Sequence, residues 1–124
     1  MVAFNFKSRF ACAVARGTKR QTIRAYRKDG RDPAPGCRLQ LYSGMRTKHC
    51  RKLGDAVLAS RERIVIADDG IKVGGRVLDA RERHELAVAD GFADWPGMRD
   101  FFAETHGLPF EGYLYRWRDF QAAE

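Results

Sequence analysis

The chain of 124 residues has only three cysteines and no long apolar run. Because a membrane-spanning helix needs about 18 apolar residues in succession, we expect no membrane partner. The first ten residues hold no unbroken apolar stretch, so we expect no signal peptide and infer a cytoplasmic protein. Cys12, Cys37 and Cys50 are odd in number and none are spaced Cys-x-x-Cys, which argues against a disulfide framework or a zinc ribbon. They are predicted to be reduced, partly buried thiols.

Motifs for common cofactors are also missing. The sequence contains no Gly-x-Gly-x-x-Gly and no Walker loop. His49 stands beside Cys50, but the further ligands that a metal needs are absent nearby, and His49, His84 and His106 follow no catalytic spacing. We therefore expect no cofactor and no metal.

What the chain does have is positive charge, concentrated in its first half. Residues 1–63 hold 16 Lys and Arg against 4 Asp and Glu, a net charge of +12, whereas residues 64–124 hold 7 against 12, a net charge of −5. A basic half on a small domain favours a polyanionic partner, namely RNA, DNA or a nucleotide. The alternative is a solvated basic surface without a specific ligand.

Apolar periodicity predicts the order strand, helix, several strands, two helices, strand. Phe6, Phe10 and Val14 recur every four residues, which is typical of a helix, and Gly17 is a suitable end for it. Strands are expected at residues 2–6, 22–26, 38–42, 55–67, 71–73, 76–78 and 113–117, and helices at residues 80–89 and from 94 to about 106. Residues 27–36 form a loop.

Two local signals refine this prediction. Asp69-Gly70 between β-branched runs predicts a hairpin with a type I′ turn, and Asp94-Trp95-Pro96 predicts a helix start. The whole pattern favours an α+β protein: one domain over residues 1–124, with a small, curled, barrel-like sheet of mostly antiparallel or mixed strands and flanking helices.

Residues 16–24 place several reactive side chains between the first helix and the next strand. Lys19 supplies a proton acceptor, Thr22 a hydroxyl nucleophile, and Arg20 and Arg24 supply anion recognition. Each also has an ordinary explanation, since lysine and arginine are common surface charges and threonine is a good strand residue.

These residues resemble a known family, the ASCH domain, a relative of the PUA domains. The resemblance rests on Gly17, Lys19, Thr22 and Arg24, on Gly36 before the strand at residues 39–42, on the Asp-Gly-Phe element at residues 90–92, and on the final aromatic strand. It covers nearly the whole chain, and residues 41–47 resemble the form found in phage and prophage members. The resemblance implies a small PUA-like β-barrel with helices around it and a cleft that serves RNA or nucleoside chemistry.

Some members of that family hydrolyse the amide of N4-acetylcytidine with a lysine, a threonine and a glutamate. By position, the resemblance implies that Lys19, Thr22 and Asp90 are the catalytic residues. Asp90 is one methylene shorter than the family's glutamate, and a shortfall of about 1 Å can lower a rate on the order of 100-fold. Threonine attack on the acyl carbon and attack by lysine-activated water both fit the sequence.

Two other functions remain open. One is an RNA-binding module without catalysis, and the other is a metal-independent ribonuclease. In the RNA-binding module, exposed cations would contact phosphates and Tyr42 or Phe92 would stack on a base. In the ribonuclease, Lys19 and a nearby arginine would activate the 2′-hydroxyl and stabilise the phosphorane. The substrate or RNA contacts expected from the sequence are Arg20, Arg24, Tyr42, Arg46 and Phe92, and the further phosphate contacts are Arg9, Arg16, Arg27, Lys28, Arg31, Lys48, Arg51 and Lys52.

Overall fold

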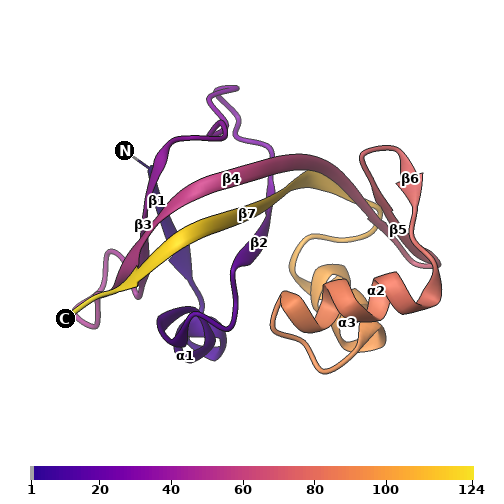
Figure 1. Cartoon of the computed structure of the whole chain (residues 1–124). Helices are drawn as coiled ribbons and strands as arrows, with labels where there is room; N and C mark the ends of the chain where they lie inside the picture. The colour runs from indigo at the N-terminus through magenta and orange to yellow at the C-terminus, as the bar shows by residue number, and fades with distance from the viewer. Residues whose placement is uncertain (1) are drawn as a thin grey trace. The chain divides into compact units, whose positions relative to one another are not determined.

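The computed structural model describes residues 2–124, which form seven strands and three helices (Figure 1). Parallel and antiparallel pairs are both present, so the predicted α+β class is confirmed. In chain order the elements are β1 (Val2–Phe6), α1 (Ser8–Arg16), β2 (Gln21–Ala25), β3 (Arg38–Ser43), β4 (Arg51–Ala67), β5 (Gly70–Val73), β6 (Arg76–Val77), α2 (Ala80–Ala89), α3 (Trp95–Thr105) and β7 (Phe110–Ala122).

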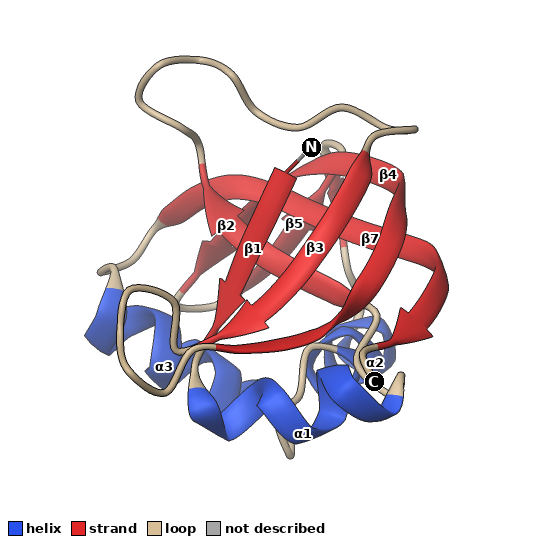
Figure 2. Ribbon diagram, turned by 90° about the vertical axis from the view of Figure 1, so that its left-hand side faces the viewer, coloured by secondary structure: helices blue, strands red, loops and turns tan. Residues whose placement is uncertain are grey.

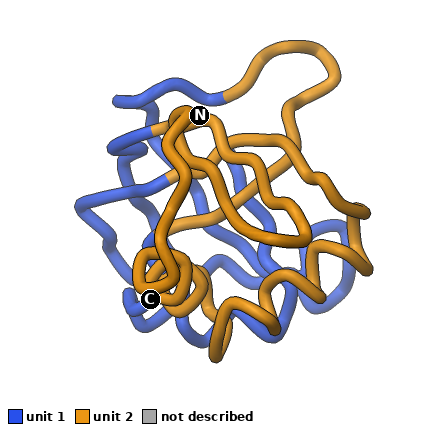
Figure 3. The backbone as a smooth tube through the Cα atoms, turned by 90° about the vertical axis from the view of Figure 1, so that its right-hand side faces the viewer, with its two compact units in different colours: residues 1–20, 33–60, 116–124 blue, residues 21–32, 61–115 orange. Residues whose placement is uncertain are grey.

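The chain divides into two compact units (Figure 3). Unit 1 consists of residues 1–20, 33–60 and 116–124, and unit 2 of residues 21–32 and 61–115. The long strands β4 and β7 each contribute residues to both units. The prediction of a single ASCH domain over residues 1–124 stays a prediction.

In unit 1, β1 and β3 run parallel, and β3 pairs antiparallel with the first part of β4. Figure 2 shows β1 and β3 side by side, with α1 following directly after β1. Phe10 and Val14 lie on the buried face of α1, as predicted, whereas Phe6 is buried as the last residue of β1 and is not part of the helix. Gly17 ends the helix with a φ of 77°, in the left-handed region that glycine adopts without strain.

In unit 2, β4, β5 and β6 form two successive hairpins. The predicted type I′ turn at Asp69-Gly70 is wrong. Ala67 pairs with Gly70, so Asp68 and Asp69 form the turn, and neither has a positive φ. The turn with two positive φ angles is at Gly74-Gly75, between β5 and β6, because two successive glycines adopt that conformation at less cost than two aspartates.

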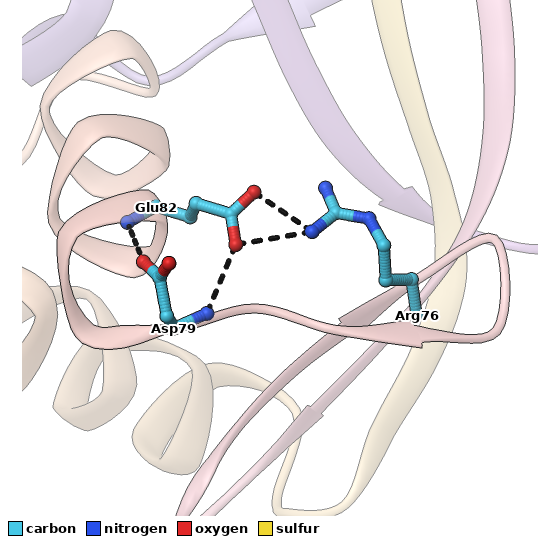
Figure 4. A network of polar contacts seen from close by, with 3 residues as sticks. All are labelled: Arg76, Asp79 and Glu82. Atoms are coloured by element: carbon cyan, nitrogen blue, oxygen red, sulfur yellow. Dashed lines mark hydrogen bonds and ion pairs between the residues drawn. The ribbon is translucent and has the colours of Figure 1, made fainter.

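Helices α2 and α3 of unit 2 both begin at an aspartate cap. Asp94 accepts a hydrogen bond from the backbone of Gly97, which confirms the predicted start of α3. Asp79 and Glu82 form a capping box at α2, in which each side chain accepts from the other residue's backbone N–H (Figure 4). Arg76 of β6 donates to the Glu82 carboxylate at 2.8 and 3.0 Å, which joins the second hairpin to the start of α2.

The structure also bears on membrane-spanning helices, metal-binding side chains and the exposure of the cysteines. Among residues 2–124, no helix has the length and apolar character to cross a bilayer, and no three His, Cys, Asp or Glu side chains gather as a metal site. Cys12 and Cys50 are exposed and Cys37 is half-buried. The expectation of partly buried thiols is therefore wrong for Cys12 and Cys50, because Cys12 lies on the outer side of α1 and Cys50 in the turn before β4.

Candidate functional site

Four polar or charged side chains in the described chain are buried. Lys19 is 3% exposed, Gln21 4%, Thr22 6% and Asp90 4%. A buried polar or charged group costs free energy unless partners replace its water, and such groups concentrate at functional sites. Three of these four residues, Lys19, Thr22 and Asp90, are the ones that the ASCH resemblance gives as catalytic.

Lys19 belongs to unit 1 and follows the end of α1. Its backbone N–H donates to the carbonyl of Ala13 at 3.1 Å, and the αL conformation of Gly17 turns the chain so that this bond can form. The ammonium nitrogen lies 4.9 Å from the centre of the Phe10 ring and 6.0 Å from that of Phe6. Cation–π contacts with these rings therefore supply part of what the buried ammonium loses in hydration.

Thr22, Gln21 and Asp90 belong to unit 2. Thr22 and Gln21 lie at the start of β2, and Asp90 is the C-terminal cap of α2. The side-chain amide of Gln21 donates to the Asp90 carboxylate at 3.2 Å and lies 3.5 Å from the carbonyl of Leu86. This bond fixes the end of α2 to the start of β2, so that the Asp90 carboxylate is held beside the strand that carries Thr22.

Arg24 adds a positive charge to the same part of unit 2. Burial lowers the pKa of Arg24 to about 10; the charges of Tyr115 and Asp90 oppose this lowering and the charge of Arg27 adds to it. Burial also raises the pKa of Tyr115 from 10.0 to about 12. At neutral pH the guanidinium of Arg24 is therefore protonated and the phenol of Tyr115 is neutral, and the two groups interact electrostatically.

The other residues predicted to bind substrate have different environments. Arg20 is exposed and its Nε donates to the carbonyl of Gly17 at 2.8 Å. Tyr42 is half-buried in β3, and Arg46 is exposed in the turn after β3 with a φ of 66°. Phe92 is 5% exposed and its ring centre lies 5.2 Å from that of Phe101, so it is a core side chain of unit 2.

The fold itself has known counterparts. Two of the similar solved structures are mutant forms of ZmASCH from Zymomonas mobilis, one with a tyrosine-to-phenylalanine change and one with a serine-to-alanine change. Each superposes with a TM-score of 0.59 at 18% sequence identity. The alignments cover 98% of this chain and 71% of the first structure's chain, and 97% and 68% for the second.

The chain has the ASCH fold. This likeness confirms the predicted ASCH-type, PUA-like fold class and covers almost every residue. No family model and no curated protein matches the sequence.

Two candidate functional residues, Gln21 and Tyr115, were not predicted from the sequence. Gln21 stands between Lys19 and Thr22 and is buried with a partner, but nothing in its spacing marks it as different from an ordinary strand residue. In the sequence, Tyr115 is one member of the alternating aromatic pattern of the last strand. Its neighbour Leu114 is also buried, so both faces of β7 are covered there. A strand covered on both faces lacks alternating polar residues, and that lack of alternation is the sequence signal that could have indicated the burial of Tyr115.

Proposed function

We propose that this protein hydrolyses the amide of an N4-acylated cytidine, with Lys19, Thr22 and Asp90 as catalytic residues. The observation that carries the proposal is their burial. A lysine, a threonine and an aspartate that the family pattern singles out are three of only four buried polar residues in the described chain. Apolar packing does not account for the burial of these three polar side chains.

In the proposed reaction, Lys19 reacts in its neutral amine form and accepts the proton of the Thr22 hydroxyl as the hydroxyl oxygen attacks the acyl carbon. The bond between that carbon and N4 breaks, N4 takes a proton and leaves as cytidine, and Asp90 assists that proton transfer. Water then cleaves the acyl-threonine ester, which releases the carboxylic acid and restores Thr22. In the alternative course, a water activated by Lys19 attacks the acyl carbon directly. Arg24, protonated at neutral pH, supports the developing negative charge in either course.

The test is turnover of N4-acetylcytidine to cytidine, measured by chromatography. Lys19→Met keeps a long apolar stem against Phe6 and Phe10 but removes the base, so we expect kcat/KM to fall about 100- to 10,000-fold. Asp90→Asn can still accept from Gln21 and should be impaired for lack of the carboxylate. Lys72→Met, an exposed lysine of β5, is the matched control and should retain wild-type turnover. Full activity of Lys19→Met would refute the proposal.

Two substitutions at Thr22 separate the two courses. Thr22→Val keeps the shape of the side chain without its hydroxyl, and Thr22→Ser keeps the hydroxyl. If the hydroxyl is the nucleophile, Thr22→Val loses turnover and Thr22→Ser retains part of it. If water attacks, both retain turnover, and Lys19→Met alone is inactive.

A second candidate function is RNA binding without catalysis, which the charge of unit 1 favours. Unit 1 holds 12 Lys and Arg against 3 Asp and Glu, a net charge of +9, whereas unit 2 holds 11 against 13, a net charge of −2. Charge of one sign at that density attracts a phosphate backbone. Wild-type protein that binds RNA but releases no cytidine from N4-acetylcytidine would favour this function over the first.

A further inference from the structure

Aromatic side chains and a guanidinium form a surface platform on unit 2. The ring centres of Tyr26 and Tyr113 lie 4.9 Å apart at an interplanar angle of 77°, and the Arg61 guanidinium carbon lies 4.7 Å from the centre of the Tyr113 ring. We call Tyr26, Tyr113 and Arg61 the tyrosine platform. Tyr113 thus contacts both Tyr26 and Arg61, and the Tyr26 ring packs against the Tyr113 ring.

Tyr26 differs from the other aromatic residues of the protein. It is 38% exposed, and it is the one exposed Phe, Tyr or Trp among residues 2–124. A single exposed tyrosine needs no explanation by itself. A tyrosine that is both exposed and held by a T-shaped partner presents a fixed π-surface, which is the surface on which a nucleobase stacks.

The loop that follows Tyr26 is rich in cations. Arg27, Lys28 and Arg31 are exposed and form no ion pair within residues 2–124. The two carboxylates of this loop are used to fold it. Asp32 accepts from the backbone N–H of Arg27 at 2.8 Å, and Asp29 accepts from that of Arg31 at 2.9 Å. The loop therefore presents positive charge directly after the exposed ring.

The platform and the loop are also connected. Arg61 donates to the backbone carbonyl of Asp32 at 3.2 Å, so the residue that covers Tyr113 also holds the end of the loop. The charges of Asp32, Arg61 and Arg27 also act on the pKa of Tyr115, which lies two residues after Tyr113 in β7. A stacking surface and a set of guanidinium groups thus meet in one part of unit 2.

We infer that the tyrosine platform and the 27–31 cations bind one nucleotide of a single-stranded RNA. The base stacks on Tyr26, Arg27 and its loop neighbours contact the phosphates, and Arg61 positions Tyr113. Stacking plus guanidinium–phosphate contact is the pair of interactions that single-stranded RNA offers and a free nucleoside, lacking phosphate, does not. The inference rests on the proposed function in one respect: it takes the acylated cytidine to be part of a single-stranded RNA and not a free nucleoside.

The test is a titration of a fluorescent single-stranded oligocytidylate of about ten nucleotides, followed by anisotropy. The dissociation constant should rise roughly 5- to 150-fold in Tyr26→Ala, the range that the loss of one stacked base gives. Tyr26→Phe keeps the ring and should bind within about twofold of wild type. Tyr26→Leu, which keeps bulk without a π-face, should resemble Tyr26→Ala and provides a second variant if that one folds poorly.

The phosphate contact has its own readout. Arg27→Gln should lower the slope of log affinity against log salt by about 0.7, the value for one phosphate contact on a single strand. Arg81→Gln is the matched control, because Arg81 is an exposed arginine of α2, paired with Glu85. Its slope should equal that of wild type.

The outcomes separate this inference from the proposed function. The oligonucleotide has no acyl group, so RNA binding that depends on the Tyr26 ring supports the platform even if N4-acetylcytidine is not hydrolysed. No binding by wild type, or equal binding by wild type and Tyr26→Ala, overturns the platform. In that case hydrolysis of N4-acetylcytidine that depends on Lys19 still supports the proposed function.

Discussion

At the scale of single residues, the informative side chains are those with polar groups under apolar cover. Lys19 is surrounded by phenyl rings in unit 1, and Asp90 is held by Gln21 in unit 2. Burial lowers the pKa of Arg24 and raises the pKa of Tyr115. Perturbed groups of this kind are more common at sites that bind or react than in ordinary cores.

The raised pKa of Tyr115 predicts a loss of stability at alkaline pH. The phenol ionises near pH 10.0 when unfolded and near pH 12 when folded. Between these values the unfolded state releases a proton that the native state keeps, so the free energy of unfolding falls as the pH rises. The contribution of Arg24 to the free energy of unfolding has the opposite sign, because burial lowers its folded pKa to about 10, below its unfolded value. Arg24 is present in wild type and in a Tyr115→Phe variant alike, so a difference between these two proteins reports Tyr115.

Tyr115→Phe should therefore lose less stability than wild type on going from about pH 9 to about pH 11, as measured by urea unfolding at each pH. The loss of the hydroxyl itself changes stability at both pH values alike, so the difference between them reports the ionisation. An equal pH-dependent loss in the two proteins would show that Tyr115 does not titrate as its burial indicates.

The sequence predicted the buried catalytic candidates and missed their support. Lys19, Thr22 and Asp90 follow a pattern of residue types, which a sequence displays directly. Gln21 matters through a hydrogen bond to a residue 69 positions away, which local spacing does not encode. Phe92 was expected to meet a base, but its ring packs on Phe101 in the core, and Tyr26 has the exposed ring instead. Burial of an aromatic ring depends on tertiary packing and not on its immediate neighbours in sequence.

At the scale of secondary-structure elements, the position of Arg24 depends on how closely β7 approaches β2. A β-carbon on Gly112 of β7 would lie 2.2 Å from the backbone oxygen of Arg24 and 2.9 Å from its carbonyl carbon. Real β-carbons do not approach a backbone that closely, so a side chain there would force the two strands apart. Gly112 has no positive φ, and the requirement for glycine is therefore one of space.

Gly112→Ala should lower the free energy of unfolding by roughly 3 kcal/mol, the upper part of the range for overpacking a core. Gly70→Ala is the matched control, because a β-carbon there would meet the Arg83 side chain at an ordinary 3.6 Å. It should change stability by less than about 1 kcal/mol. Urea unfolding of both variants measures the difference, and similar values for the two would mean that β7 and β2 separate without cost.

Elements with local start and stop signals were the ones predicted well. Gly17 and Asp94 act within one turn of their own helix, and both were identified from the sequence. The β4–β5 turn was misplaced by one residue because the register of a hairpin depends on the packing of both strands as well as on its turn residues. Strand β4 starts at Arg51, four residues before the predicted start, because Lys52 and Leu53 lie in a part of the sequence without clear alternation.

At the scale of the whole molecule, the two units differ in charge, although less than the two halves of the sequence, which carry +12 and −5. Unit 1 carries +9 and unit 2 carries −2. The exposed cations of unit 1 include Arg46, Lys48 and Arg51, in and beside the turn after β3. The turn is held by Thr47, whose hydroxyl donates to the carbonyl of Gly44 at 2.6 Å and accepts from the backbone N–H of His49 at 3.1 Å.

If RNA contacts unit 1, neutralising that turn should reduce the salt dependence of binding. We expect the triple variant Arg46→Gln, Lys48→Gln, Arg51→Gln to lower the log–log salt slope by up to about 2, the value for three phosphate contacts. The matched control removes three exposed cations of unit 2, Arg63, Lys72 and Arg81, and so the same net charge. Equal slopes for the two triple variants would mean that only total charge matters and that unit 1 has no specific contact.

The division into units has a consequence for how such a protein can change over generations. The chain passes from one unit to the other four times, after residues 20, 32, 60 and 115. No single crossover between two genes can exchange one unit and leave the other intact. The first passage falls between Lys19 and Thr22, so two residues of the proposed catalytic set are encoded within a few codons although they belong to different units. Recombination would therefore transmit that pair together more readily than it would transmit either unit.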